Sequence, residues 1–192
     1  RLECAVAIVQ STRRLSNLIF NMLKLNKLEK QTIVPKAEPY DLCEQLCECV
    51  IEFDTVMEKK DIEFEAELED QAMIEADKDL MALVWNNLLS NAVKFTPPGG
   101  SIVLRQHTDS DGINVSVSDT GCGMDRDTQK KIFEKFYQGD TSHATEGNGL
   151  GLALVLRVLH LLDCQISVQS EPGNGSTFTV HIPLKLLAEG SK

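Results

Sequence analysis

The sequence lacks a basic excess, a long apolar run and paired cysteine motifs, and each absence excludes a class of protein. The formal net charge is −10, so the surface as a whole repels phosphate backbones and we expect no nucleic-acid partner. No apolar run approaches the roughly 18 residues that a membrane span needs, so we expect no membrane contact by these residues. The chain begins in the middle of a helical pattern. We therefore expect a longer cytoplasmic parent, which a span upstream of Arg1 could anchor in the inner or plasma membrane.

The six cysteines do not form a recognisable disulfide or metal framework. No two CxxC motifs are present, and the four histidines are scattered. Cys43 and Cys47 are four residues apart in a helical pattern, so a two-ligand site is one interpretation. We favour the other interpretation, which is small buried or half-buried thiols in a reducing cytoplasm.

What the sequence does hold is the composition of one globular domain with a short appendage. Its 192 residues are 42% hydrophobic and 25% charged, which is typical of a soluble domain. Residues 1 to about 30 carry apolar side chains at spacings near three and four. This spacing predicts one long helix, which needs a partner helix to bury its stripe. Pro35 and Pro39 then mark a linker.

The rest of the chain alternates between helical and strand patterns. Helices are predicted over about 41–59, 77–95 and 148–162, and strands over 62–68, 72–75, 101–108, 112–118, 165–170 and 175–183. Residues 119–147 form a long loop, which in a compact domain is usually functional or mobile. The order is not a regular βαβ repeat, so we predict an α/β fold of the α+β two-layer type. A mixed, largely antiparallel sheet would be covered on one face by about three helices and preceded by a single long helix.

Asn87, Asn91 and Lys94 share one face of the predicted helix 77–95, because they stand at positions i, i+4 and i+7. Trp85 and Leu88 lie on the opposite face, which we expect in the core. Two amides and an ammonium in a row suit a magnesium and phosphate site, because Mg²⁺ takes oxygen ligands while bridging substrate phosphates. Taken alone, the pattern also fits a solvated polar face.

The segment Asp119-Thr120-Gly121-Cys122-Gly123-Met124 directly follows a predicted strand. Glycines let the backbone approach a ligand closely, and a carboxylate at this place can accept a hydrogen bond from the exocyclic amine of adenine. A plain strand-ending turn is the alternative, and it explains one glycine better than two.

Two further segments complete the set. The short amphipathic piece 132–137 carries Phe133 and Phe136, which fit simple packing of the long loop as well as a functional role. The segment Gly147-Asn148-Gly149-Leu150-Gly151-Leu152 opens a predicted helix, where backbone N–H groups form an anion site. Its spacing matches neither a P-loop nor a dinucleotide-binding fingerprint.

Together, in this order, the four segments resemble the N, G1, F and G2 boxes of sensor histidine kinases. The resemblance covers about residues 35–185, and residues 10–30 resemble the second helix of that family's dimerisation and phosphotransfer domain. It implies a Bergerat-type sandwich, shared with gyrase, heat-shock chaperone and mismatch-repair ATPases. It also implies a dimerisation helix with linker over 1–34, an ATP-binding catalytic domain over 35–187 and a tail over 188–192.

The resemblance implies a domain that binds Mg-ATP under a mobile lid and transfers the γ-phosphoryl group to a histidine. Asn91 would be the Mg²⁺ ligand, with Asn87 close by and Lys94 touching the phosphates. Asp119 would read adenine. The other implied nucleotide contacts belong to the glycine-rich turns and the lid, and they are Gly121, Gly123, Met124, Phe133, Phe136, Gly147, Asn148, Gly149, Leu150, Gly151 and Leu152.

The residue four positions before Asn91 favours transfer to histidine over hydrolysis. The resemblance implies a glutamate there, as general base, in relatives that hydrolyse ATP or phosphorylate serine. Here that residue is Asn87, whose amide cannot take a proton at neutral pH. Neutral histidine needs less help, because its ring nitrogen carries a free lone pair near pH 7. A gyrase- or chaperone-like ATPase and a regulatory nucleotide-binding module without kinase activity are the alternatives.

The long loop departs from the family pattern at Gln138, where many relatives carry Arg or Lys. A cation there would stabilise charge on the γ-phosphate, and Lys135 is the candidate substitute. The acceptor is also missing, because no histidine stands in a His-Glu-x-x-x-Pro context. The four histidines are His107, His143, His160 and His181.

The acceptor histidine would therefore lie on a helix preceding residue 1, and these residues alone would bind ATP without labelling themselves. The resemblance also implies two protein partners. One is a second copy, in a homodimer formed through the dimerisation helices of the full-length protein. The other is the receiver domain of a response regulator, which we expect near Arg13 and Arg14.

Replacing Asp119 with Asn should erode the preference for ATP over GTP. The carboxylate accepts from the adenine amine and repels the guanine carbonyl, whereas an amide can do either. Competition of the two nucleotides for the wild type and for Asp119→Asn measures this preference. Equal affinity of the wild type for ATP and GTP would show that Asp119 does not read the base.

Overall fold

The computed structural model describes residues 2–30, 33–139 and 148–187. The chain opens with α1 (Leu2–Glu29), the long helix that the sequence predicts. The other helices are α2 (Leu42–Ile51), α3 (Asp54–Lys59), α4 (Lys78–Phe95), α5 (Arg126–Lys131), α6 (Gly151–Leu161) and the 3-10 turn η1 (Leu184–Leu186). The strands are β1 (Glu38–Asp41), β2 (Glu63–Glu67), β3 (Met73–Ala76), β4 (Ser101–Thr108), β5 (Gly112–Asp119), β6 (Gln165–Ser170) and β7 (Ser176–Pro183).

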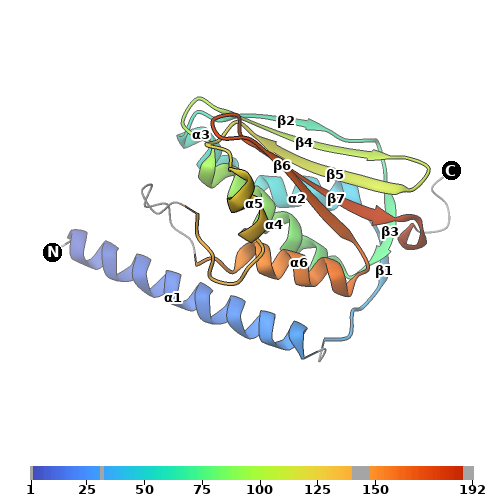
Figure 1. Cartoon of the computed structure of the whole chain (residues 1–192), viewed down its shortest axis with the longest axis horizontal. Coiled ribbons are helices and arrows are strands. Elements are labelled where there is room, and N and C mark those ends of the chain that lie inside the picture. The colour runs from blue at the N-terminus through green and yellow to red at the C-terminus, as the bar shows by residue number, and fades with distance from the viewer. Residues whose placement is uncertain (1, 31–32, 140–147, 188–192) are drawn as a thin grey trace.

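Five strands form the main sheet in the order β2-β4-β5-β7-β6. The β2–β4 pair is parallel, and the other three pairs are antiparallel. Figure 1 shows α2, α4 and α6 together on one face of this sheet. The predicted two-layer fold with a mixed, largely antiparallel sheet is therefore confirmed.

Strand alternation decides which face of the sheet the helices cover. Along β5, Ile113, Val115 and Val117 are buried, whereas the intervening Ser116 and Ser118 are only partly covered. Successive side chains point to opposite faces of a strand, so the apolar set faces the helices. The polar set faces away from them, and one layer of helices is enough to complete the core.

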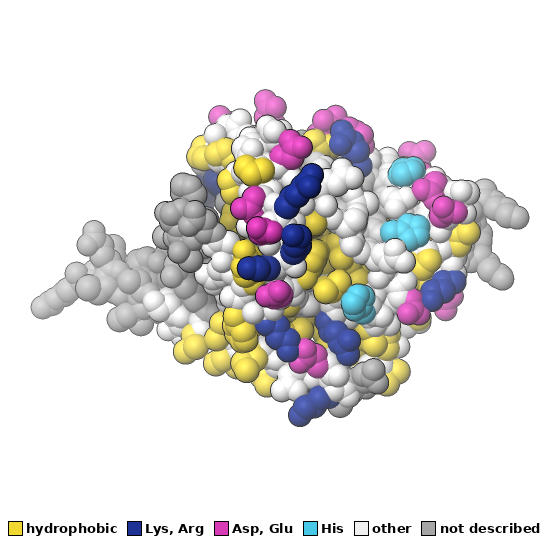
Figure 2. Space-filling view, viewed as in Figure 1, with side chains coloured by type: hydrophobic (Ala, Val, Ile, Leu, Met, Phe, Trp, Pro, Cys, Tyr) yellow, Lys and Arg dark blue, Asp and Glu magenta, His cyan; other side chains and the backbone are white. Residues whose placement is uncertain are grey.

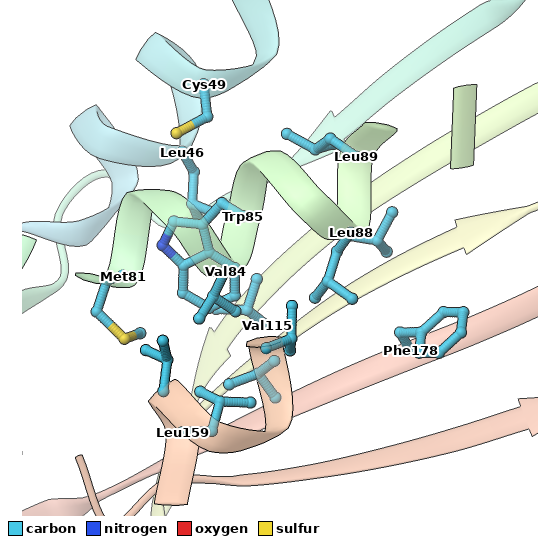
Figure 3. Packing of buried hydrophobic residues seen from close by; sticks show 14 of the residues in the cluster. Leu46, Cys49, Met81, Val84, Trp85, Leu88, Leu89, Val115, Leu159 and Phe178 are labelled. Carbon is cyan, nitrogen blue, oxygen red and sulfur yellow. The ribbon is translucent and has the colours of Figure 1, made fainter. Parts of the chain in front are cut away.

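α4 is the central helix of that layer. It begins at Asp77, whose carboxylate accepts from Leu80 N at 3.0 Å, and it ends at Thr96, just before Pro97. Figure 3 shows the Trp85 indole at the centre of the packing, between Leu46 of α2 and Leu159 of α6. The indole Nε1 donates to the buried Gln45 Oε1 at 3.1 Å, so its one polar atom is satisfied.

α1 lies against α6 through its last two turns. Leu25 and Leu28 are buried there, and Arg157 of α6 donates to the Leu28 carbonyl oxygen at 3.3 Å. Farther up α1, large apolar side chains are exposed, and Figure 2 shows hydrophobic surface gathered along this helix. They are Val9, Leu15, Ile19, Phe20, Met22 and Leu23. No helix among the described residues is long and apolar enough to cross a membrane.

The structure corrects the sequence prediction in three places. The predicted linker contains a strand, β1, which pairs antiparallel with β3 in a separate small sheet. The predicted helix 41–59 is two helices, because the chain turns tightly where Phe53 N bonds Val50 O at 2.9 Å. The periodicity continues across this turn because both pieces pack on one core. The predicted loop contains α5, which Asp125 caps by accepting from Thr128 N at 2.7 Å.

The five cysteines whose side chains the structure describes are small buried or exposed thiols. Cys43, Cys49 and Cys164 are buried, and Cys47 and Cys122 are exposed, and all five are free. Cys43 Sγ lies 3.3 Å from Gln106 Oε1. The two thiols of the two-ligand interpretation lie in different environments, because Cys43 is buried and Cys47 is exposed.

Leu46→Ala and Ile51→Ala should separate core from surface on the same helix. Leu46 is fully buried, so its truncation leaves a cavity and should cost about 2–5 kcal/mol of unfolding free energy. Ile51 is 72% exposed, and its truncation should change stability by less than about 0.5 kcal/mol. Urea unfolding followed by circular dichroism measures both, and equal losses would contradict the described packing of α2.

Candidate functional site

The polar face of α4 lies where the sequence places it. Asn87, Asn91 and Lys94 are all half-buried, opposite the buried Trp85. Lys94 Nζ lies 4.4 Å from the centre of the Phe95 ring. Burial lowers the pKa of Lys94 below its ordinary value, because removing the ammonium from water disfavours the charged form.

The Asn87 side chain joins α4 to the start of α6. Its Nδ2 donates to Leu83 O at 2.7 Å, which leaves Oδ1 directed outwards from the helix. A Cβ added at Gly151 would lie 2.6 Å from that Oδ1. The two motifs thus meet at a point where only glycine leaves room for the amide.

Asp119 ends β5 and turns back on the backbone that follows it. Its Oδ1 accepts from Gly121 N at 2.8 Å. Burial raises the pKa of Asp119, and the backbone N–H groups of Gly121 and Ser176 oppose that rise in part by stabilising the carboxylate. A Cβ at Gly121 would stand 2.6 Å from Oδ1 and 2.7 Å from the Phe95 carbonyl oxygen. Gly121 therefore lets the end of α4 and the carboxylate approach each other.

The rest of the Asp119 turn is anchored to the end of β6. Gly123 has a φ of +64°, and a Cβ there would overlap the Glu171 carbonyl oxygen. Met124 N donates to Ser170 Oγ at 2.8 Å. Gln129 Nε2 adds bonds of 3.0 Å to Met124 O and 2.8 Å to Ser170 O. This network fixes the backbone beside Asp119.

Sequence reasoning missed the turn that precedes β7. Gly175 has a φ of +76°, and a Cβ there would overlap the Asp119 carbonyl oxygen. The neighbouring Ser176 pairs with Asp119 across the antiparallel β5–β7 ladder. The available signal is the pair Gly173 and Gly175 directly before the last strand. Its partner in space, however, depends on a strand pairing that the sequence does not reveal.

The loop motif and the helix-opening motif also meet. Phe136 N donates to Gly149 O at 2.8 Å, and a Cβ at Gly149 would lie 2.7 Å from the Phe136 carbonyl carbon. Phe133 packs against the core and lines a cavity of about 160 Å³ with Leu25 of α1, whereas Phe136 is 57% exposed. Gly147 lies outside the described residues.

The opening of α6 departs slightly from the prediction. The helix begins at Gly151, because Gly149 has a φ of +66° and Asn148 Oδ1 accepts from Leu150 N at 3.1 Å. Leu150 is fully buried and Leu152 is half-buried, so both pack inwards. Because these side chains anchor the turn, only the backbone groups of Leu150 and Leu152 could contact a ligand.

Lys135, the candidate substitute cation, contacts the end of α1 in this structure. Its Nζ lies 2.5 Å from Glu29 Oε1, and its role at the phosphate site stays a prediction. The two side chains of this pair are 45% and 43% exposed, so the pair is weak and does not hold Lys135 firmly at α1.

With this geometry in view, comparison with known proteins gives a clear answer. The family model described as histidine kinase-, DNA gyrase B- and HSP90-like ATPase matches residues 76–186. The chain belongs to this ATPase family. The match spans α4, the Asp119 turn, the loop and α6, so it covers all four motifs on which the resemblance rests.

Named members of this ATPase family resemble nearly the whole chain. The sensor-like histidine kinase SenX3 of Mycobacterium tuberculosis is 30% identical over 181 residues, which are 93% of this chain and 44% of that protein. The circadian input-output histidine kinase CikA of Synechococcus elongatus is 36% identical over 195 residues, 97% of this chain and 26% of that protein. The crystal structure of full-length ShkA in complex with AMPPNP has a TM-score of 0.85 at 28% identity, covering 98% of this chain and 39% of that one. The chain thus spans less than half the length of these relatives.

Asp119→Asn should also change how stability depends on pH. Because the folded-state pKa of Asp119 is raised, the native state binds more protons than the unfolded state between the ordinary pKa of 3.8 and the raised value. Wild-type stability therefore falls as pH rises through that window, and the uncharged variant escapes this loss. Thermal melts should show the midpoint of the variant, relative to wild type, higher at about pH 7 than at about pH 3.5. A constant difference would mean that Asp119 titrates normally.

Proposed function

We propose that this chain is the ATP-binding catalytic part of a sensor histidine kinase. Residues 35–187 would be the catalytic domain, residues 1–34 the second dimerisation helix with its linker, and residues 188–192 a tail. The observation that carries the proposal is the meeting of Asn87 with Gly151, 64 positions apart in the sequence and in contact in the fold. The contact brings the polar face of α4 to the N-terminus of α6, as a triphosphate site requires.

The nucleotide would lie between the Asp119 turn and the start of α6. Asp119 would accept from the adenine amine, with the backbone of Gly121, Gly123 and Met124 beside the base. Asn91 and Lys94 would face the phosphates, together with the backbone N–H groups at the start of α6. The relative ShkA, solved with the ATP analogue AMPPNP, supports ATP as the ligand.

A magnesium ion fits these residues only as part of the nucleotide complex. The described residues offer no acidic or histidine cluster that could hold it by itself. Asn91 can supply one amide oxygen, which suits an ion that keeps several waters and binds mainly to phosphates. When bound, Mg²⁺ neutralises charge on the transferring phosphoryl group.

The reaction would be transfer of the γ-phosphoryl group to a histidine outside these residues. Asn87 Nδ2 is already engaged with Leu83 O, and its amide cannot act as a base, so the site lacks the proton acceptor that a water or serine nucleophile needs. His181 Nδ1 lies 3.1 Å from Asn114 Oδ1 on the far side of the sheet, and His107 stands beside Asp109. Neither histidine is placed to be the acceptor.

Two protein partners follow from the same proposal. The exposed apolar side chains of α1, including Leu15, Ile19 and Met22, would be covered by a second copy in a helical bundle. The phosphoryl group would then pass to the receiver domain of a response regulator. The predicted docking residues Arg13 and Arg14 lie on α1, and their side chains lie outside the described part of the structure.

Labelling with γ-labelled ATP and Mg²⁺ tests the function. The chain alone should bind ATP without becoming labelled. A version preceded by a helix with a His-Glu-x-x-x-Pro acceptor should gain label that is labile in acid and stable in base, because phosphohistidine has that behaviour. In this longer version Asn91→Ala should lose the label, and the exposed neighbour Ser90→Ala should keep it.

The other outcomes would identify the alternatives. Bound ATP without label on either protein would favour a regulatory nucleotide-binding module. Rapid release of free phosphate by the chain alone would favour a gyrase- or chaperone-like ATPase, and would contradict the role assigned to Asn87.

A further inference from the structure

Lys60 caps the C-terminus of α4 from another helix. Its Nζ lies 2.6 Å from Val93 O, 2.6 Å from Thr96 O and 3.4 Å from Lys94 O. An ammonium has three donors, and here they face the last carbonyl groups of α4. These carbonyls have no partner within their own helix and carry its negative end charge.

The local structure at the end of α3 aims this side chain. Ile62 N bonds Met57 O at 3.0 Å and Asp61 N bonds Glu58 O at 3.1 Å, which is the Schellman pattern of a helix end. Asp61 takes the left-handed conformation that the pattern requires, with a φ of +53°. Lys60 is therefore held at the last position before the turn, half-buried and directed towards α4.

The carbonyls that Lys60 holds belong to Val93, Lys94 and Thr96, so they lie on both sides of two groups of the predicted site. Lys94 is the cation assigned to the phosphates, and the Phe95 carbonyl oxygen is the atom that packs on Gly121 beside Asp119. The loop after α4 is tied in the same way, because Gly99 N donates to Lys60 O at 3.1 Å. The backbone of Lys60 thus fixes the loop, and its side chain fixes the helix end.

A second set of contacts leads from that loop to the Asp119 turn. A Cβ at Gly100 would lie 2.5 Å from Thr96 Cγ2 and 2.8 Å from Thr120 Oγ1, so the three residues are closely packed. Thr120 Oγ1 also accepts from Ser101 N at 2.8 Å. A shift of the α4 end would therefore displace the turn that carries Asp119.

We propose that Lys60 is a positioning residue of the nucleotide site, which sets the affinity for ATP by fixing the C-terminal turn of α4 and the Asp119 turn without touching the ligand. This inference rests on the proposed function. Without the ammonium, three carbonyl oxygens lose their donor, and the end charge of α4 is no longer neutralised next to the phosphate-facing Lys94. The C-terminal turn of α4 and the Asp119 turn then both become more mobile.

The test compares Lys60→Met with Lys59→Met. Methionine keeps most of the aliphatic stem and removes the ammonium, and Lys59 is the exposed neighbour on the same helix. Calorimetric titration with Mg-ATP, at a temperature where circular dichroism shows each protein folded, should give about tenfold weaker binding for Lys60→Met, equivalent to about 1.4 kcal/mol. Lys59→Met should bind as the wild type does. Lys60→Arg should recover part of the loss, because its guanidinium can donate to the same carbonyls.

Hydrogen exchange of single amides, measured without nucleotide, separates positioning from general stability. In Lys60→Met the amides of Thr96 and Gly121 should exchange faster, whereas that of Leu80, at the other end of α4, should not change. Wild-type ATP affinity in folded Lys60→Met, or equal acceleration at all three amides, would overturn the inference. A wild type that binds no ATP would overturn the proposed function, and the exchange pattern would still show whether Lys60 holds the two turns.

Discussion

The site depends on the burial of one face of α4. Trp85, Leu88 and Leu89 of that face are almost completely removed from water between the sheet and the neighbouring helices. Burial of side chains of this size is the dominant favourable term in folding, so the rotation of the helix about its axis is fixed. The opposite face then presents Asn87, Asn91 and Lys94 in a row. Their position is set by the packing of the apolar face and not by contacts of their own.

Around this helix, the site is assembled from close approaches of backbone. Gly151 makes room for Asn87, Gly121 makes room between Asp119 and the end of α4, and Gly175 lets the last strand pass the Asp119 carbonyl. Each contact joins segments far apart in the sequence. A surface made mainly of main-chain groups suits a polyanion with an aromatic base, because N–H donors and glycine edges offer contact without bulky side chains.

Much of this arrangement could be predicted from the sequence, because the strongest signals are local. The cap at Asp77, the proline after Thr96 and the alternation along β4–β7 place most elements within a few residues. Signals that depend on tertiary pairing were missed. The strand β1 contains Pro39 and is recognisable only through its partner β3. The role of Lys60 depends on the contact between the ends of α3 and α4, which the sequence does not reveal. The roles of the individual site residues stay predictions.

The small sheet has a consequence for how the two ends of the described structure are held relative to the Asp119 turn. Its strand β3 pairs with β1, which precedes α2, and Ile74 of β3 also bridges to Leu187, which follows η1. Figure 1 shows β1 and β3 beside the end of the main sheet that holds the β4–β5 turn, whereas Asp119 is at the other end of β5. The segment before the main sheet and the segment after β7 thus meet at one short strand, at the far end of β5 from Asp119. Strain in either segment is taken up at this small sheet before it can reach the Asp119 turn.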